Sequence, residues 1–193
     1  EVLKYSSKFL NDKVYFWDSD FHSRVGHDAE ETPPHQDSFL KCLENGYEYM
    51  LTCYIALTDI PISSNSMKII KGSHRKDTLD HKKSLKLGFS SVIEEDADDL
   101  PNELLENEID IPLKAGDALF FHSKVIHYTK RRLKPSSIKN RRMALAIRIF
   151  GDSVKFSEKR KKVYIQNVEY NRKHSINLGL TKTSPTKVDS AYN

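Results

Sequence analysis

The segment 142–150 has two chemically different faces, and this alternation restricts the fold more than any other feature of the sequence. Because side chains alternate across a β-strand, every second residue falls on the same face. One face carries two arginines with two alanines between them, and the other is wholly apolar: Arg142, Ala144, Ala146 and Arg148 against Met143, Leu145, Ile147 and Ile149. The apolar face suits packing against another layer, whereas small alanines beside arginines suit the wall of a ligand cavity. The pattern therefore predicts a sheet strand that lines a cavity.

Further segments rich in aromatic and β-branched residues predict a mainly β chain with few helices. We expect strands at 14–21, 47–57, 67–70 and 118–122, a short helix near 100–105, and a helix with a loose tail over 161–193. The length of 193 residues is normal for one domain, so we expect a single domain over residues 1–193. Strand-like signals begin soon after Glu1, and we expect that an N-terminal segment precedes the sequence given.

Several classes of protein are disfavoured by composition. The sequence has no apolar run of about 18 residues and no apolar leader, which predicts a soluble, cytoplasmic protein without a membrane partner. Cys42 and Cys53 are too few for a disulfide scaffold, and we interpret both as reduced core thiols. The net charge of +4 is unevenly placed, but no nucleic-acid-binding motif accompanies the basic segments, so we expect no nucleic-acid partner. The sequence does not define an oligomeric state.

A candidate metal site starts at Pro33-Pro34-His35-Gln36-Asp37. His35 and Asp37 are two residues apart and would share one face of an extended strand, and His127 lies far downstream. Two imidazoles and one carboxylate with open positions are the ligand set of non-haem Fe(II) oxygenases. His122 competes as third ligand, and on an unbroken strand its odd offset from His127 would place only one of the two at the metal. Zinc accepts the same ligands and would activate water for hydrolysis instead.

Three motifs in order along about 14–150 carry a family resemblance. Glu31–Asp37 is similar to E-T-P-x-H-Q-D, Asn65–His74 to G-x-L-x-x-x-P-G-S-H, and Gly116–His122 with His127 to G-D-x-x-F-F-H-x-x-x-x-H. The chain therefore resembles the phytanoyl-CoA dioxygenase family of Fe(II)/2-oxoglutarate-dependent oxygenases. It departs from the pattern at Asn65 and Lys71, where the family usually has Gly and Pro.

The resemblance implies a double-stranded β-helix, the jelly-roll or cupin-like core, with flanking helices. It implies Fe(II), 2-oxoglutarate and O₂ as cofactor and co-substrates, and His35, Asp37 and His127 as the iron ligands, which favours His127 over His122. It places Arg142, rather than Arg141, at the distal carboxylate of 2-oxoglutarate, because Arg142–Ala146 fits the family pattern R-x-A-L-A. Thr129 falls where the family often has a hydroxyl that contacts this carboxylate. Tyr54 falls where some members have an aromatic residue near the co-substrate, and the alternative interpretation of Tyr54 is a core tyrosine.

The implied activity is hydroxylation of an unactivated C–H bond of a small organic substrate, with release of succinate and CO₂. The alternatives are a zinc-dependent hydrolase and a non-oxidative metal-binding cupin-like protein, while the intact ligand set with Arg142 argues against a non-catalytic binding module. The basic segment 130–134 follows the distal ligand, and Arg148 shares the cavity face with Arg142. These charges lead to the hypothesis of a small or tethered anionic substrate that carries a carboxylate, phosphate or phosphonate, and the alternative is that the lysines of 130–134 are simply solvated.

Overall fold

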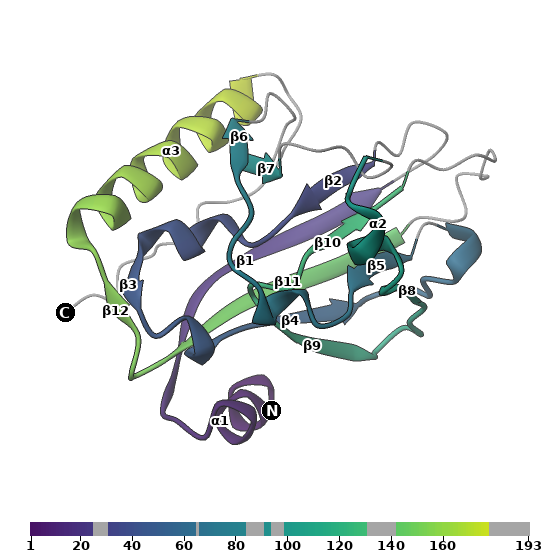
Figure 1. Cartoon of the computed structure of the whole chain (residues 1–193), viewed down its shortest axis with the longest axis horizontal. Helices are drawn as coiled ribbons and strands as arrows, with labels where there is room; N and C mark the ends of the chain where they lie inside the picture. Colours follow the sequence, from purple (N-terminus) through teal and green to yellow (C-terminus); the bar gives the residue numbers. More distant parts are fainter. Residues whose placement is uncertain (25–30, 65, 84–90, 94–98, 131–141, 178–193) are drawn as a thin grey trace.

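Two four-stranded antiparallel sheets form the body of the protein (Figure 1), whose computed structural model describes residues 1–24, 31–64, 66–83, 91–93, 99–130 and 142–177. The larger sheet has the order β1 (Val14–Arg24), β11 (Arg142–Gly151), β4 (Met50–Ala56) and β9 (Ala118–His122). The smaller sheet has the order β2 (Thr32–His35), β10 (His127–Thr129), β5 (Met67–Ile70) and β8 (Glu108–Ile111). The chain crosses repeatedly between the two sheets, as in a double-stranded β-helix. The predicted fold class is confirmed.

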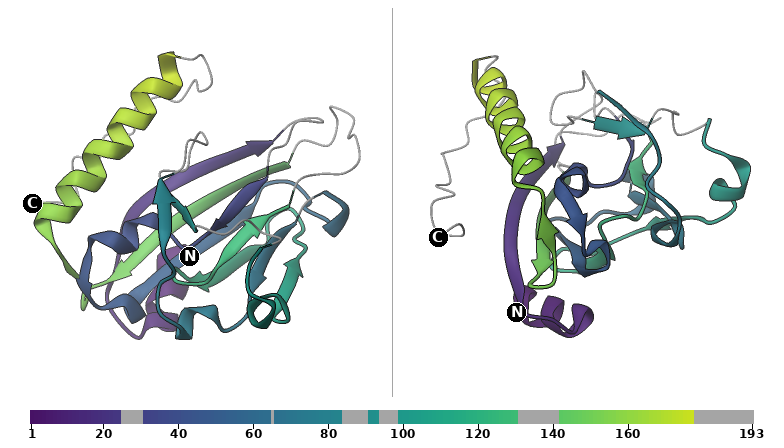
Figure 2. Two further views of the ribbon diagram at one scale, coloured as in Figure 1. Left: turned by 45° about the horizontal axis from the view of Figure 1, so that its top comes forward. Right: turned by 60° about the vertical axis from the view of Figure 1, so that its left-hand side comes forward.

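Smaller elements surround this body. Two short ladders pair β3 (Leu43–Asn45) with β12 (Lys155–Phe156) and β6 (His81–Lys83) with β7 (Ser91–Ile93). The α-helices are α1 (Val2–Leu10), α2 (Asn102–Leu105) and α3 (Glu158–Asn177), and the 3-10 turns are η1 (Ser38–Cys42), η2 (Tyr47–Tyr49), η3 (Ile62–Ser64) and η4 (Ser73–Arg75). Helix α1 packs against β1, β11 and β4, and α3 runs beside η1 at the edge of the molecule (Figure 2). No helix in the described part of the chain combines the length and apolar character needed to cross a membrane.

Most of the expected elements are present. The strands expected at 67–70 and 118–122 have those bounds, and the expected strands at 14–21 and 142–150 lie within β1 and β11. The strand expected over 47–57 is wrong in its first part, because 47–49 form a 3-10 turn entered from Gly46 at φ 82°. Helix α1 was not expected. It is amphipathic, and its large side chains Leu3, Tyr5 and Phe9 are all exposed. Helix α3 starts before the expected position, and the expected tail after 177 lies outside the described residues.

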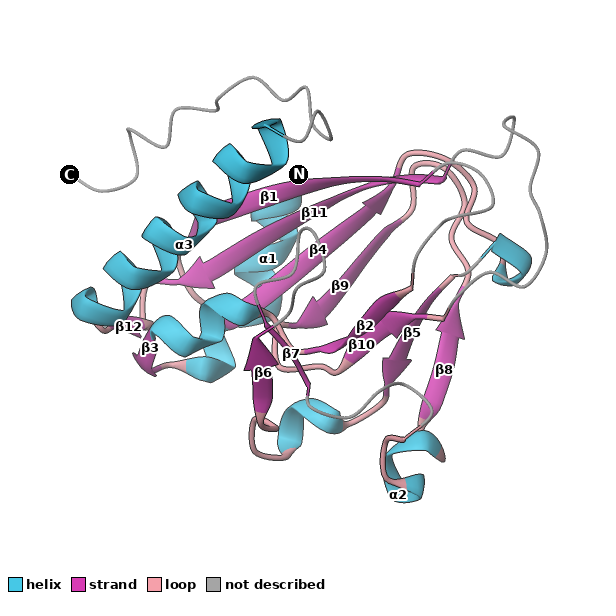
Figure 3. Cartoon of the chain, turned by 90° about the horizontal axis from the view of Figure 1, so that it is seen from above, coloured by secondary structure: helices cyan, strands magenta, loops and turns pink. Residues whose placement is uncertain are grey.

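The two sheets face each other across an apolar core (Figure 3). Buried side chains from the larger sheet meet Met67 and Ile69 of the smaller sheet; they include Tyr54, Ala56, Phe121, Ala144 and Ala146. Each large apolar side chain buried in such a core contributes about 1.5 to 3 kcal/mol. The two alanines on the inner face of β11 have small side chains, so they take up little of the space between the sheets, as the alternation predicts.

A β-bulge in β1 sets which of its side chains point inward. Phe16 pairs with Ile149 and Asp18 with Arg148, which are adjacent partners on β11, so Trp17 is an extra residue. A bulge opposes two residues to one on the neighbouring strand. Trp17 packs inward against Phe39, Phe156 and Tyr164, and Asp18 also reaches an inner partner, Arg148.

Candidate metal centre

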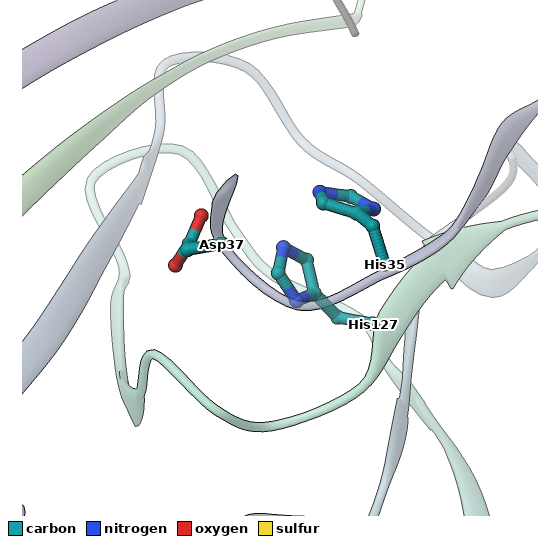
Figure 4. Close-up of side chains that lie close together, drawn as sticks. All are labelled: His35, Asp37 and His127. Atoms are coloured by element: carbon teal, nitrogen blue, oxygen red, sulfur yellow. The ribbon is translucent and has the colours of Figure 1, made fainter. Parts of the chain in front are cut away.

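Three buried side chains that could hold a metal ion meet between the sheets (Figure 4). His35 is the last residue of β2 and His127 the first of β10, and the antiparallel register places the two directly opposite each other. Asp37 follows two residues after His35. One ligand atom from each residue lies within 4.8 Å of the others, and no other such group occurs among the residues that the structure describes.

Asp37 does not belong to the same strand as His35, so this part of the sequence interpretation is wrong. Strand β2 ends at His35, and Asp37 precedes the turn η1 with φ −56° and ψ 126°. The backbone stays extended at Asp37 without pairing in the sheet, and its N–H donates to the Ser123 carbonyl at 3.2 Å. The extended backbone still returns the carboxylate to the side of His35.

Both histidines are prepared to act as neutral ligands. Nδ1 of His35 lies 2.9 Å from the Pro33 carbonyl oxygen, and Nδ1 of His127 lies 2.9 Å from that of Val125. A carbonyl only accepts, so each Nδ1 carries the proton and each Nε2 keeps a lone pair for a metal. Burial lowers the pKa of both imidazoles, and for His35 the neighbouring His127 lowers it further. Both rings are thus held in the form that binds metals.

Asp37 is held as an anion by two donors. Burial by itself raises the pKa of the Asp37 carboxyl, but Arg148, His127 and the hydroxyl of Thr52 outweigh it and lower the pKa below its usual value. Arg148 Nε donates to Oδ1 at 3.1 Å, and Thr52 Oγ1 donates to Oδ2 at 2.6 Å. Two neutral imidazoles and one carboxylate form a donor set that fits Fe(II) and leaves positions for other ligands.

His122 lies apart from this group. The premise that it shares an unbroken strand with His127 is wrong, because β9 ends at His122 and the chain crosses to the smaller sheet before β10 begins. Its ring stacks on His74 with 5.4 Å between the ring centroids. Burial, followed by the nearby His74 and Lys124, lowers the pKa of His122 to about 4.

The residues predicted for the co-substrate lie on inner faces of both sheets. Arg142 and Tyr54 are buried, and Arg142 Nη2 donates to the Tyr54 hydroxyl at 3.0 Å. Thr129 is buried on β10, where its hydroxyl accepts the Thr32 N–H at 2.9 Å. The structure therefore brings Arg142 and Tyr54 into contact and leaves the Thr129 hydroxyl hydrogen for another acceptor. Arg141 lies outside the described residues.

Arg148 has a different environment from the one expected. It does lie on the inner face with Arg142, but its charge is already paired with carboxylates, so the expectation of a cation for the substrate is wrong. The register aligns Asp18, Arg148 and Thr52 on neighbouring strands of the larger sheet. Asp18 and Thr52 were not predicted from the sequence, in which only the two-residue spacing of Asp18 and Asp20 indicates a shared face.

A cavity of about 150 Å³ opens beside Asp37. Its other lining residues come from the segment after β2, the turns η1 and η2, the segment before β6 and the start of β6: Gln36, Leu40, Lys41, Tyr47, Thr78 and His81. The Nδ1–H of His81 donates to the Leu79 carbonyl at 2.6 Å, which leaves Nε2 to accept the Gln36 N–H at 3.3 Å. Burial lowers the pKa of His81, so this ring is also neutral. The cavity gives space for a small molecule next to the proposed metal ligand.

Comparison with known proteins identifies the family. The sequence profile described as Phytanoyl-CoA dioxygenase (PhyH) matches residues 1–139, which is most of the chain. The chain belongs to this family. Enzymes of the phytanoyl-CoA dioxygenase family use Fe(II), 2-oxoglutarate and O₂, and the donor set described above fits that metal. No curated protein matches the chain.

Solved structures agree with this family in fold. The epimerase SnoN, in complex with Fe³⁺, alpha ketoglutarate and nogalamycin RO, matches with a TM-score of 0.61 and 18% identity over 80% of this chain and 57% of its own. The carbocyclase SnoK from nogalamycin biosynthesis matches with a TM-score of 0.62 and 21% identity over 81% and 57%. EctD from S. alaskensis, with 2-oxoglutarate and 5-hydroxyectoine, matches with a TM-score of 0.60 and 17% identity over 81% and 51%. The chain thus spans somewhat more than half the length of these proteins.

Proposed function

We propose that this protein is an Fe(II)- and 2-oxoglutarate-dependent dioxygenase that hydroxylates an unactivated C–H bond of a small organic substrate. The observation that carries the proposal is the buried group of His35, Asp37 and His127, in which both imidazoles are neutral and the carboxylate is ionised. Bound there, the iron would couple oxidative decarboxylation of 2-oxoglutarate to succinate and CO₂ with oxidation of the substrate. Membership of the phytanoyl-CoA dioxygenase family supports this assignment.

Arg142, Tyr54 and Thr129 form the proposed site for the co-substrate. Arg142 binds the distal carboxylate of 2-oxoglutarate through charge-assisted hydrogen bonds, and Tyr54 orients the guanidinium from the neighbouring strand. Thr129 donates its remaining hydroxyl hydrogen to the same carboxylate. Ala144 and Ala146 supply the space, because both are buried and small on the inner face next to Arg142. The buried position excludes water, which would otherwise weaken the ion pair.

The identity of the substrate is a separate matter. The cavity beside Asp37 suits a small molecule, and we place the substrate there. The expectation of an anionic substrate stays a prediction, because most of the basic segment 130–134 lies outside the described residues and Arg148 is neutralised by the protein. The structurally similar proteins include an epimerase and a carbocyclase by name. Identification of the reaction product is therefore what distinguishes hydroxylation from another oxidation.

The test is a turnover assay with Fe(II), 2-oxoglutarate and O₂, in which succinate and oxidised product are both measured. The wild-type protein should form succinate, and Zn(II) in place of Fe(II) should give none. Asp37→Ala should abolish both succinate and product, because the metal loses its one anionic ligand. The matched control is Asp110→Ala, which removes an aspartate of β8 that pairs with Lys68 and is not one of the three clustered groups. Ordinary succinate formation by Asp37→Ala would refute the ligand assignment.

A further inference from the structure

The guanidinium of Arg148 bridges the proposed metal ligand Asp37 to two carboxylates on another strand. Its Nε donates to Asp37 Oδ1 at 3.1 Å, and its Nη1 donates to Asp18 Oδ1 at 2.9 Å and Asp20 Oδ2 at 2.7 Å. The Arg148 side chain is only 14% exposed, and that of Asp37 only 3%. This contact spans 111 residues of sequence and lies in the interior, where water does not replace a lost donor.

Arg148 and Thr52 together fix the plane of the Asp37 carboxylate. The terminal torsion of an aspartate is broad, so a carboxylate without partners rotates readily. Here Oδ1 accepts from Arg148 and Oδ2 accepts from Thr52, so rotation in either direction breaks a hydrogen bond. The Thr52 hydroxyl lies a further 3.1 Å from the Ser123 hydroxyl, which holds it in place. Each carboxylate oxygen keeps a second lone pair that a metal can use.

The charges around Arg148 are balanced for a divalent ion. An arginine without other partners would repel a nearby dication. Here Asp18 and Asp20 on β1 pair with Nη1 of Arg148 and offset its positive charge. Three carboxylates, one guanidinium and a dication together carry no net charge. The Tyr164 hydroxyl of α3 also donates to Asp18 Oδ2 at 3.3 Å, which connects the helix to this network.

We propose that Arg148 is a positioning residue that holds Asp37 in its metal-binding orientation, with Asp18 and Asp20 as its anchors. The inference rests on the proposed function, since it takes Asp37 as a metal ligand. Arginine suits the role because its planar fork reaches carboxylates on two sides in one fixed geometry. A lysine keeps the charge but offers a single flexible ammonium group.

The experiment measures Mn(II) affinity of the whole chain without 2-oxoglutarate, from the electron paramagnetic resonance signal of free Mn(II). Arg148→Lys and Arg148→Gln should each weaken Mn(II) binding by about 10- to 100-fold, the usual effect of removing a group that orients a metal ligand. Thr52→Val, which keeps the shape of the side chain, should also weaken binding. The matched control is Lys68→Gln, which removes another largely buried, ion-paired cation, held by Glu108 and Asp110 in the smaller sheet, and it should leave Mn(II) affinity unchanged.

Thermal unfolding of the metal-free variants separates positioning from a purely structural role. A lower unfolding temperature with unchanged Mn(II) affinity in Arg148→Lys and Thr52→Val would overturn the inference. Tighter Mn(II) binding by Arg148→Gln would also overturn it, because repulsion would then be the main effect of the arginine. If Asp37→Ala binds Mn(II) as the wild type does, the proposed metal site itself fails, and this result is distinct from both of the others.

Discussion

Arg142→Ala tests the co-substrate site most directly. Arg142 is 8% exposed and donates a hydrogen bond to Tyr54 in the interior. Because the site is buried, water would not replace the guanidinium in the variant. Loss of a buried, charge-assisted pair costs about 2 to 5 kcal/mol. At about 1.4 kcal/mol for each tenfold change, 2-oxoglutarate should bind about 30- to 4,000-fold more weakly.

The assay is titration calorimetry of 2-oxoglutarate into Mn(II)-loaded protein, with 2-oxopentanoate as a second ligand. This analogue has a methyl group in place of the distal carboxylate. Wild-type protein should strongly prefer 2-oxoglutarate, and Arg142→Ala should lose most of that preference, since the two changes remove the same interaction. Tyr54→Phe keeps the ring and removes only the hydroxyl, so it should cost about 0.5 to 1.5 kcal/mol.

The result that would refute the reasoning is a full preference for 2-oxoglutarate in Arg142→Ala with Mn(II) binding intact. In that case the distal carboxylate has another partner. If Arg141→Ala shows the loss instead, the register of the arginine is off by one residue. Either result leaves the metal ligands unaffected.

Three further outcomes are expected from the structure. The free energy of unfolding of the metal-free protein should decrease as pH falls below about 6.5, because histidines take up protons there in the unfolded chain, whereas His35, His127 and His122 have lowered pKa values in the fold. Urea titrations at several pH values should show this decrease, and it should be smaller in His122→Gln. Gly46→Ala should cost more than the roughly 1 to 2 kcal/mol expected for left-handed backbone alone, because the new Cβ would lie 2.8 Å from a backbone carbon; Gly72→Ala, with the same φ of 82° and open space, is the control, and equal losses in urea titrations would contradict this. Burial raises the pKa of the Cys53 thiol to about 11, so native protein at pH 8 should react with a thiol reagent far more slowly than unfolded protein, and equal rates would contradict the burial.

The sequence predicted best those features that depend on side-chain period. Strand β11 alternates cleanly, so its inner arginines and alanines were assigned to one face correctly. The spacing of His35 and Asp37 correctly predicted that the two side chains lie close together, but for a partly wrong reason. Backbone pairing ends β2 at His35, and the end of pairing cannot be seen in the order of the side chains. The change of sheet between His122 and His127 was equally hidden, since a four-residue crossing resembles a continuous strand in composition.

Ion pairing was beyond the reach of the sequence. The two-residue spacing placed Arg148 on the inner face, but its partners are set by the register of β1 against β11 and by the position of Asp37 just before η1. Asp18 and Asp20 alternate in the same way as many exposed strand residues, and only the three-dimensional register shows that they meet an arginine. The expected role of Arg148 toward substrate failed for this reason.

The extra residue at Trp17 divides β1 into two parts with different roles. Before it, the inward positions serve packing, and after it they carry the carboxylates that hold Arg148. Because Phe16 and Asp18 already oppose adjacent residues of β11, deletion of Trp17 would leave a regular ladder in which Asp18 and Asp20 still face the interior. The loss would fall instead on the aromatic contacts that Trp17 makes with Phe39, Phe156 and Tyr164, so the extra residue adds a packing side chain to the inner face without disturbing the carboxylates.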